Sequence, residues 1–208
     1  MRKSTLGGVV GPIVFTIVTI VAGAMRPDYL HTQNFISELG ATGTANAALM
    51  NYAGFVLGGL LIASLGLAMF KLLPRGLSMS LGSVLVGLFG IGVALSGVVS
   101  CDLGCPQATG STANTIHNAI APLAFLSLIV ASVLLGVRWR SDSQLQKIAI
   151  YSILTGISGF ALLGMLASSL ESRELTGLWQ RLLLLVLFSW CIIVGLNLGS
   201  YEMKQQPS

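Results

Sequence analysis

Six long apolar runs, separated by short polar connections, constrain the fold of this chain more than any other feature of its sequence. A run of about 18 or more apolar residues is long enough to cross a bilayer as an α-helix. We therefore predict an all-α, polytopic membrane protein, a six-transmembrane-helix bundle that forms a single domain over residues 1–208. The spanning helices are expected at residues 6–25, 47–70, 77–100, 115–137, 148–170 and 178–198.

The composition excludes a water-soluble domain. Hydrophobic residues make up 54% of the chain and charged residues only 9%, whereas a soluble domain carries about 25% charged residues. The net charge of +4 comes from the loops beside the spans, so no basic face indicates a nucleic-acid partner. The 25 glycines include the pairs Gly7/Gly11 and Gly54/Gly58, whose spacing favours close helix contacts in membranes.

Lysine and arginine are unevenly divided between the two sides of the predicted bundle. Eight lie on the side of the two termini and of the second and fourth connections, and three lie on the other side. The positive-inside rule then predicts a multi-pass protein of the cell (inner) membrane with both termini in the cytoplasm. In this orientation Tyr29 and Trp179 are expected in the outer aromatic belt, and Trp139 and Tyr201 in the inner one.

Most of the reactive polar residues lie on the side that has few lysines and arginines. They are Asp28, His31, Glu38, Cys101, Asp102, Cys105, His117, Glu171 and Glu174. Ionisable groups are costly inside the bilayer, so they gather at its edges. Because the first, third and fifth connections meet over one end of a narrow bundle, we expect these side chains to form an outward-facing polar site.

His117 is the first candidate catalytic residue, since it stands in the first turn of the fourth span. The positive end of the helix dipole disfavours its protonated form, and a neutral imidazole serves as a general base or a metal ligand. Asp102 and Glu38 are the candidate carboxylates that orient it, and any metal would use His117 and Asp102. The alternatives are a histidine bonded to loop backbone, an aspartate capping its own turn, and a solvated loop glutamate.

Arg181 is the candidate for binding an anion. It lies in the first turn of the last span, where an unpaired arginine is expensive. Its neighbour Trp179 is a further candidate binding residue. Glu38, Asp102 or Glu171 is expected to pair with it, or it holds a lipid phosphate or carboxylate. The alternative is that its side chain extends to the lipid head groups without a specific partner.

Further polar residues belong to the same end. A short helical segment is expected over residues 34–39, with Asn34 as its N-cap and its apolar face at the membrane interface. Ser37 in this segment, Asn51 in the second span and Asn118 beside the histidine are candidate binding residues. For Asn51 the alternative is a hydrogen bond between helices.

Cys101 and Cys105 share the third connection, which faces an oxidising side in the predicted orientation. This location favours a disulfide between them. Metal binding is the alternative, although two cysteines without a second pair are a weak metal motif. The spacing by itself does not establish that the disulfide geometry closes.

Five short motifs together resemble a known family. They are ISELGATG at residues 36–43, Asn51, CDxGCP at residues 101–106, HN at residues 117–118 and GLxQR at residues 177–181. The combination resembles the bacterial and archaeal membrane family numbered 998 among the domains of unknown function, over nearly the whole chain. The resemblance implies six spans. Many members have an aspartate after the histidine, and this chain departs from that pattern at Asn118.

A fainter similarity links the first connection to the Frag1/DRAM/Sfk1 group, whose members have an Ile-Ser-Asp-x-Gly stretch there. That group is associated with lipid remodelling and membrane trafficking, and the likeness is an analogy only. Neither the family nor the sequence assigns a cofactor or an oligomeric state.

The leading hypothesis is an outward-facing pocket that binds, and in an enzymatic version modifies, a lipid head group or a similar amphiphile. Arg181 would hold the anionic part, and Glu38, Asp102 and His117 would line the pocket. The first alternative is a non-enzymatic regulatory or scaffold component of the membrane. The second is a small-molecule transporter, which is disfavoured because no ionisable residue lies near the centre of a predicted span.

Overall fold

The six apolar runs form the six long helices of the computed structural model, which describes residues 3–205 of the chain and the side chains of residues 5–200. The predicted all-α, six-span architecture is confirmed. A short 3₁₀ helix precedes the second span, and that span begins as a π-helix before it continues as an α-helix. The elements are α1 (Lys3–Ala24), η1 (Ile36–Gly40), η2 (Leu49–Leu57), α2 (Gly58–Leu72), α3 (Leu77–Val98), α4 (Thr112–Trp139), α5 (Gln146–Ser168) and α6 (Thr176–Gln205).

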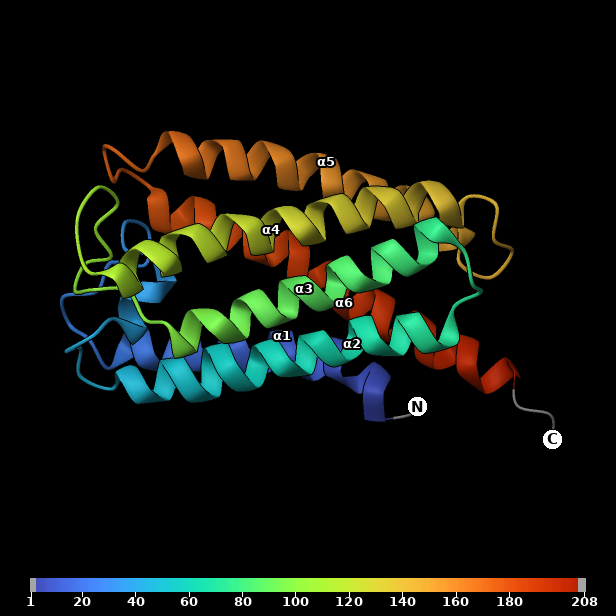
Figure 1. The fold of residues 1–208 in the computed structure, drawn as a ribbon, viewed down its shortest axis with the longest axis horizontal. Helices are drawn as coiled ribbons and strands as arrows, with labels where there is room; N and C mark the ends of the chain where they lie inside the picture. The colour runs from blue at the N-terminus through green and yellow to red at the C-terminus, as the bar shows by residue number, and fades with distance from the viewer. Residues whose placement is uncertain (1–2, 206–208) are drawn as a thin grey trace.

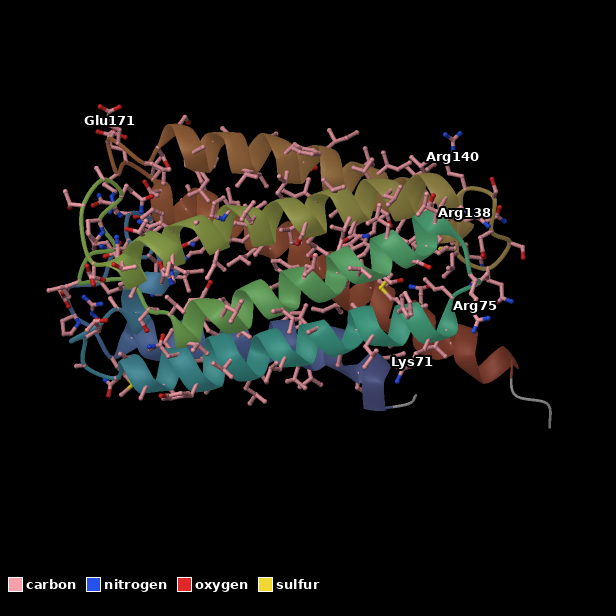
Figure 2. The ribbon with its side chains drawn as sticks, viewed as in Figure 1. Lys71, Arg75, Arg138, Arg140 and Glu171 are labelled. Atoms are coloured by element: carbon pink, nitrogen blue, oxygen red, sulfur yellow. A yellow bond between two sulfur atoms is a disulfide. The ribbon has the colours of Figure 1, made fainter. Side chains whose placement is uncertain are left out.

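The helices form one closed bundle in which each packs against its neighbours in sequence and α6 returns to pack against α1. The connections at residues 25–48, 99–111 and 169–175 meet at one end, here called the loop end (Figure 1). The opposite end carries Lys71, Arg75, Arg138 and Arg140 and is called the basic end, whereas Glu171 lies at the loop end (Figure 2). The convergence of the three connections is therefore as expected.

The outside of the bundle is apolar. Large hydrophobic side chains are exposed on separate helices, among them Ile17, Leu123 and Ile150 with 55%, 66% and 68% of their surface accessible. Soluble monomers rarely expose apolar patches of this extent. The exposed surface is therefore one that lipid covers, which supports a membrane-embedded protein in contact with lipids.

Glycine allows the helix backbones to approach closely at the bundle's contacts. A Cβ atom added to Gly59 of α2 would lie 2.6 Å from the carbonyl oxygen of Gly90 in α3. Likewise, a Cβ on Gly11 of α1 would lie 2.8 Å from the Gly58 carbonyl oxygen. The expected close packing at Gly11 and Gly58 is thus present, and dispersion contacts between backbones replace the hydrophobic effect that lipid does not supply.

The aromatic-belt prediction was wrong for two residues. Trp139 is fully buried and stacks on Trp190 of α6 with ring centroids 6.2 Å apart. Tyr29 is also buried, because its hydroxyl donates to the Phe35 carbonyl oxygen at 2.9 Å. Trp179 is half-buried. The side chains of Arg2, Lys3, Tyr201 and Lys204, on which the orientation and the inner belt partly rest, lie outside the described residues.

Replacing Gly59 by leucine is expected to destabilise the bundle by about 1–3 kcal/mol, because an inserted side chain must force α2 and α3 apart. The measurement is the unfolding free energy in mixed detergent micelles. Gly164→Leu is the matched control, since a Cβ there meets no atom within 4 Å. Equal stability of the two variants would contradict the close α2–α3 contact.

Candidate functional site

The first connection inserts η1 into the mouth of the bundle. Phe35, Ile36 and Leu39 are all buried, so the segment lies inside the loop end and not at its surface. The N-cap of this helix is Phe35, one residue after the predicted Asn34. Two backbone N–H groups at the start of α6 donate to this connection, from Gly177 to the Gln33 carbonyl at 3.2 Å and from Leu178 to the Thr32 carbonyl at 2.9 Å. These contacts satisfy donors that a helix start leaves free.

Glu38 holds this segment in place from within. Only 7% of the residue is exposed. Its Oε1 accepts from the Phe35 backbone N–H at 2.9 Å and its Oε2 accepts from Asn34 Nδ2 at 2.8 Å. A glutamate that reaches back to the residue before a helix in this way forms half of a capping box. The carboxylate is therefore a structural group and not a solvated acid.

Arg173 joins the three connections of the loop end. Its Nη1 lies 3.5 Å from Glu38 Oε1, and its Nη2 donates to the carbonyl oxygens of Gly104 and Cys105 at 3.0 and 2.8 Å. Its guanidinium also lies over the Phe35 ring, 4.5 Å from the centroid. The role of Arg173 could not be predicted, because no spacing in the sequence relates it to residue 38.

Asn51 joins the first connection to the end of α3. Its Nδ2 donates to the Gly40 carbonyl oxygen and to Ser100 Oγ, both at 2.9 Å. A Cβ on Gly40 would overlap Asn51 Oδ1, so a larger residue there would displace the Asn51 amide. Within residues 3–205, Oδ1 itself is buried and accepts no hydrogen bond. Asn51 therefore connects two structural elements by hydrogen bonds, as in the alternative given for it.

Asp102 caps the loop to which it belongs. Its two carboxylate oxygens accept from the backbone N–H and the hydroxyl of Ser111 at 2.6 and 2.8 Å. Asn114, which is 1% exposed, organises the same loop by donating to the carbonyl oxygens of Pro106 and Thr109 at 2.7 and 3.0 Å. Ser111 is also the N-cap of α4. No motif in the sequence points to this role of Asn114.

Cys101 and Cys105 are joined as a disulfide with their Cα atoms 5.1 Å apart. Ser37 packs against it, since its Oγ lies 3.4 Å from Cys105 Sγ and its carbonyl oxygen 3.7 Å from Cys101 Sγ. The backbone N–H of Thr42 donates to the Cys101 carbonyl at 2.9 Å. The disulfide loop and the first connection therefore pack as one unit.

His117 is buried and bonds to the end of the preceding helix. Its Nδ1 lies 2.7 Å from the carbonyl oxygen of Val99, the C-cap residue of α3, with the Ser96 carbonyl also near the ring. A carbonyl only accepts, so Nδ1 carries the proton and Nε2 holds the lone pair of the neutral ring. Among the described hydrogen bonds, neither Asp102 nor Glu38 contacts this histidine. His117 therefore matches the alternative of a histidine that bonds to the backbone.

The predicted metal ligands, His117 and Asp102, have separate hydrogen-bond partners. Within the described residues, no group of three or more histidine, cysteine or acidic side chains is placed to hold a metal ion. Asn118, the neighbour of the histidine, donates to the Pro106 carbonyl oxygen at 2.8 Å. His117 and Asp102 are each engaged with a different part of the backbone.

Arg181 has neutral partners in place of the expected carboxylate. Its Nη1 donates to the carbonyl oxygens of Asn34 and Gly177 at 3.1 and 2.9 Å. Its Nη2 donates to the Tyr29 hydroxyl at 2.6 Å and to His31 Nδ1 at 3.2 Å. Both described ion pairs of the loop end involve other arginines. The guanidinium charge therefore has no carboxylate partner in the part of the chain that the structure describes.

A long groove runs along the bundle surface between α1 and α6, with a volume of about 850 Å³. Its walls are mostly aliphatic, and they include Ile13, Ile17, Ile20, Leu182, Leu185 and Ile193. Arg181 and His31 also line it, and both belong to the loop end. The groove thus combines an apolar length with a cationic end.

Replacing Arg173 by leucine is expected to lower the unfolding free energy by about 2–4 kcal/mol, because the Glu38 carboxylate would stay buried without its cation. The arginine side chain is 33% exposed, which keeps the loss below that of a fully buried pair. Thermal or detergent-induced unfolding measures it. Glu174→Gln, an exposed charge in the same connection, serves as the control, and an equal effect of both changes would refute the proposed role.

The stability of the loop end is expected to depend on pH through His31. Partial burial, and then the positive charge of Arg181, lower the pKa of His31 below its ordinary value of 6.5. The folded state therefore binds this proton less tightly than the unfolded chain does. The stabilising contribution is complete above about pH 6.5 and is lost as the pH falls toward the lower folded pKa. The unfolding midpoint should fall more steeply below this pH in the wild type than in His31→Gln, and parallel curves would exclude the effect.

Comparison with known proteins agrees with the motifs. The model of the family described as protein of unknown function (DUF998) matches residues 9–197. No curated protein and no solved structure matches the chain. The likeness to the Frag1/DRAM/Sfk1 group stays an expectation. The family match covers almost the entire bundle, and the chain belongs to the DUF998 family.

Proposed function

We propose that this protein binds an anionic lipid from the leaflet at its loop end. The lipid head group would lie at Arg181 and one of its chains in the groove between α1 and α6. The observation that carries the proposal is an arginine without a carboxylate partner at the end of an apolar groove. In the orientation predicted from lysine and arginine counts, this leaflet is the outer one.

The charge of Arg181 favours an anionic ligand. An arginine at the edge of the hydrocarbon region is costly unless an anion compensates it. The described hydrogen bonds of its guanidinium use Nη1 and Nη2, which leaves the Nε–H group as a donor for a ligand. A phosphate or carboxylate accepts charge-assisted hydrogen bonds from such a group. The neutral His31 ring nearby adds no competing negative charge.

The length of the groove favours an acyl chain. Its lining extends on α6 from Arg181 to Ile193, which at 1.5 Å per residue is about 18 Å. Half of a hydrocarbon core of roughly 30 Å is similar in length. The volume of about 850 Å³ also falls within the roughly 300–1,000 Å³ that ligand sites occupy. One chain of a lipid in a single leaflet fits these dimensions.

Binding without chemistry is favoured over an enzymatic role. His117 does not line the groove that Arg181 lines. Its two candidate carboxylates are engaged elsewhere, Asp102 with Ser111 and Glu38 with Arg173. A general base needs to reach the atom from which it takes a proton. The proposed role is therefore that of a lipid-binding component of the membrane.

The test is the lipid retained by the protein after purification and exchange into nanodiscs that contain a small fraction of anionic lipid, measured by native mass spectrometry. Arg181→Gln is expected to reduce anionic lipid binding about 10- to 100-fold, as one charge-assisted contact is lost. Arg140→Gln removes a cation from the basic end and should leave binding unchanged.

A second variant distinguishes loss of lipid binding from misfolding caused by the Arg181 substitution. Leu185 is 63% exposed and lines the groove. Leu185→Trp therefore obstructs the site of the lipid acyl chain and leaves Arg181 unchanged. It should also lower lipid retention. Full retention of anionic lipid by both variants would reject the proposal.

A further inference from the structure

Two smaller cavities meet at His117, beneath η1, and a few side chains separate the inner one from the groove. One, of about 120 Å³, lies between α4 and α5, and the other, of about 40 Å³, lies inside the bundle. Both are lined by Ser37, His117, Ala121, Phe125 and Gln180. Together they are called the His117 chamber, and their combined volume is similar to that of a cavity of about 150 Å³ that accommodates benzene.

The His117 chamber has polar groups at one end and no formal charge. Its polar lining includes Ser37, Gln107, His117, Asn118 and Gln180, and neither cavity is lined by an acidic residue, a lysine or an arginine. A charged ligand would find no counter-ion there, and a purely apolar one would remove water from several polar groups without compensation. The lining therefore selects a neutral ligand that forms hydrogen bonds.

Gln180 supplies an unused donor to the chamber. The residue is 8% exposed, and its Oε1 accepts from the Ile36 backbone N–H at 2.8 Å. Its amide nitrogen donates to no acceptor among the described hydrogen bonds. Gln180 lines both cavities, so its amide N–H is available to a ligand atom that accepts a hydrogen bond.

Acceptors line the same cavity as that donor. Pro122 has no backbone N–H, so the Asn118 carbonyl oxygen four residues earlier lacks its helical donor. Both residues line the cavity between α4 and α5. His117 adds a second acceptor, since the proton on Nδ1 leaves the lone pair on Nε2. A group that accepts one hydrogen bond and donates another satisfies both sides, and a hydroxyl does so.

We infer that the His117 chamber binds the hydroxyl end of a neutral amphiphile, such as a long-chain alcohol, independently of the proposed anionic site. The tail leaves between α4 and α5, past Leu163 and Leu166. Pro122 and Ala167 line the same cavity and are exposed on the outside of the bundle, so the chamber opens toward lipid.

The experiment uses two photoreactive probes that carry the same diazirine alkyl chain and end in a hydroxyl or in a phosphate monoester. The full-length protein is labelled in phosphatidylcholine nanodiscs, and mass spectrometry locates the label. The alcohol is expected to label α4 and α5 around residues 118–125 and 163–170. The phosphate is expected in the α1–α6 groove, and its labelling alone should depend on Arg181.

A matched pair of variants tests occupancy. Ala121 lines both cavities, so Ala121→Leu fills the chamber without removing a hydrogen bond and should reduce alcohol labelling about tenfold. Ala119→Leu makes the same change at an exposed position of α4 and should have no effect. Decanol should compete with the probe more strongly than its methyl ether, which keeps the acceptor and loses the donor.

Three results would overturn the inference. The first is alcohol labelling of α4 and α5 that does not change in Ala121→Leu. The second is equal labelling of these helices by both probes, which would remove the selectivity for a neutral head. The third is labelling no stronger than that of a diazirine alkane, which would show that the hydroxyl contributes nothing to binding. If the phosphate probe does not label the groove of the wild-type protein, that result would instead count against the proposed function.

Discussion

The ion pair between the buried Glu38 and the half-buried Arg173 is the interaction on which the loop end depends. The carboxylate fixes η1 through the Phe35 backbone and the Asn34 side chain, and the guanidinium continues to the backbone of the disulfide loop. Three connections that are distant in sequence thereby form one unit. Since lipid cannot hydrate a stray carboxylate, the pair has to be made within the protein.

The position of η1 decides the shape of both proposed sites. Ile36 lines the groove between α1 and α6 and also the inner cavity of the His117 chamber. Phe15 and Leu184 are shared in the same way. A few side chains thus separate a cationic, lipid-facing groove from a neutral chamber. The arrangement divides the single outward pocket expected from the sequence into two sites of different chemistry.

The spans and the grouping of the connections could be predicted from the sequence, because apolar length and helix number determine them. The partners at the loop end could not. Glu38 was assigned to His117 or Arg181 by residue type, yet it lies against Arg173, and Arg181 lies against Tyr29. Trp139 was placed in a belt although it packs on Trp190. The hydrophobic pattern predicts which helices form. The partners of these side chains depend instead on how the loops fold across the end of the bundle.

The central claim is that lipid, and not protein, supplies the anion at Arg181. A high-resolution cryo-electron microscopy structure in nanodiscs formed with native membrane lipids tests it most directly. The account predicts an elongated density between α1 and α6 whose head lies within hydrogen-bond distance of the Arg181 guanidinium. An empty groove, or a protein carboxylate bound to that guanidinium, would contradict it.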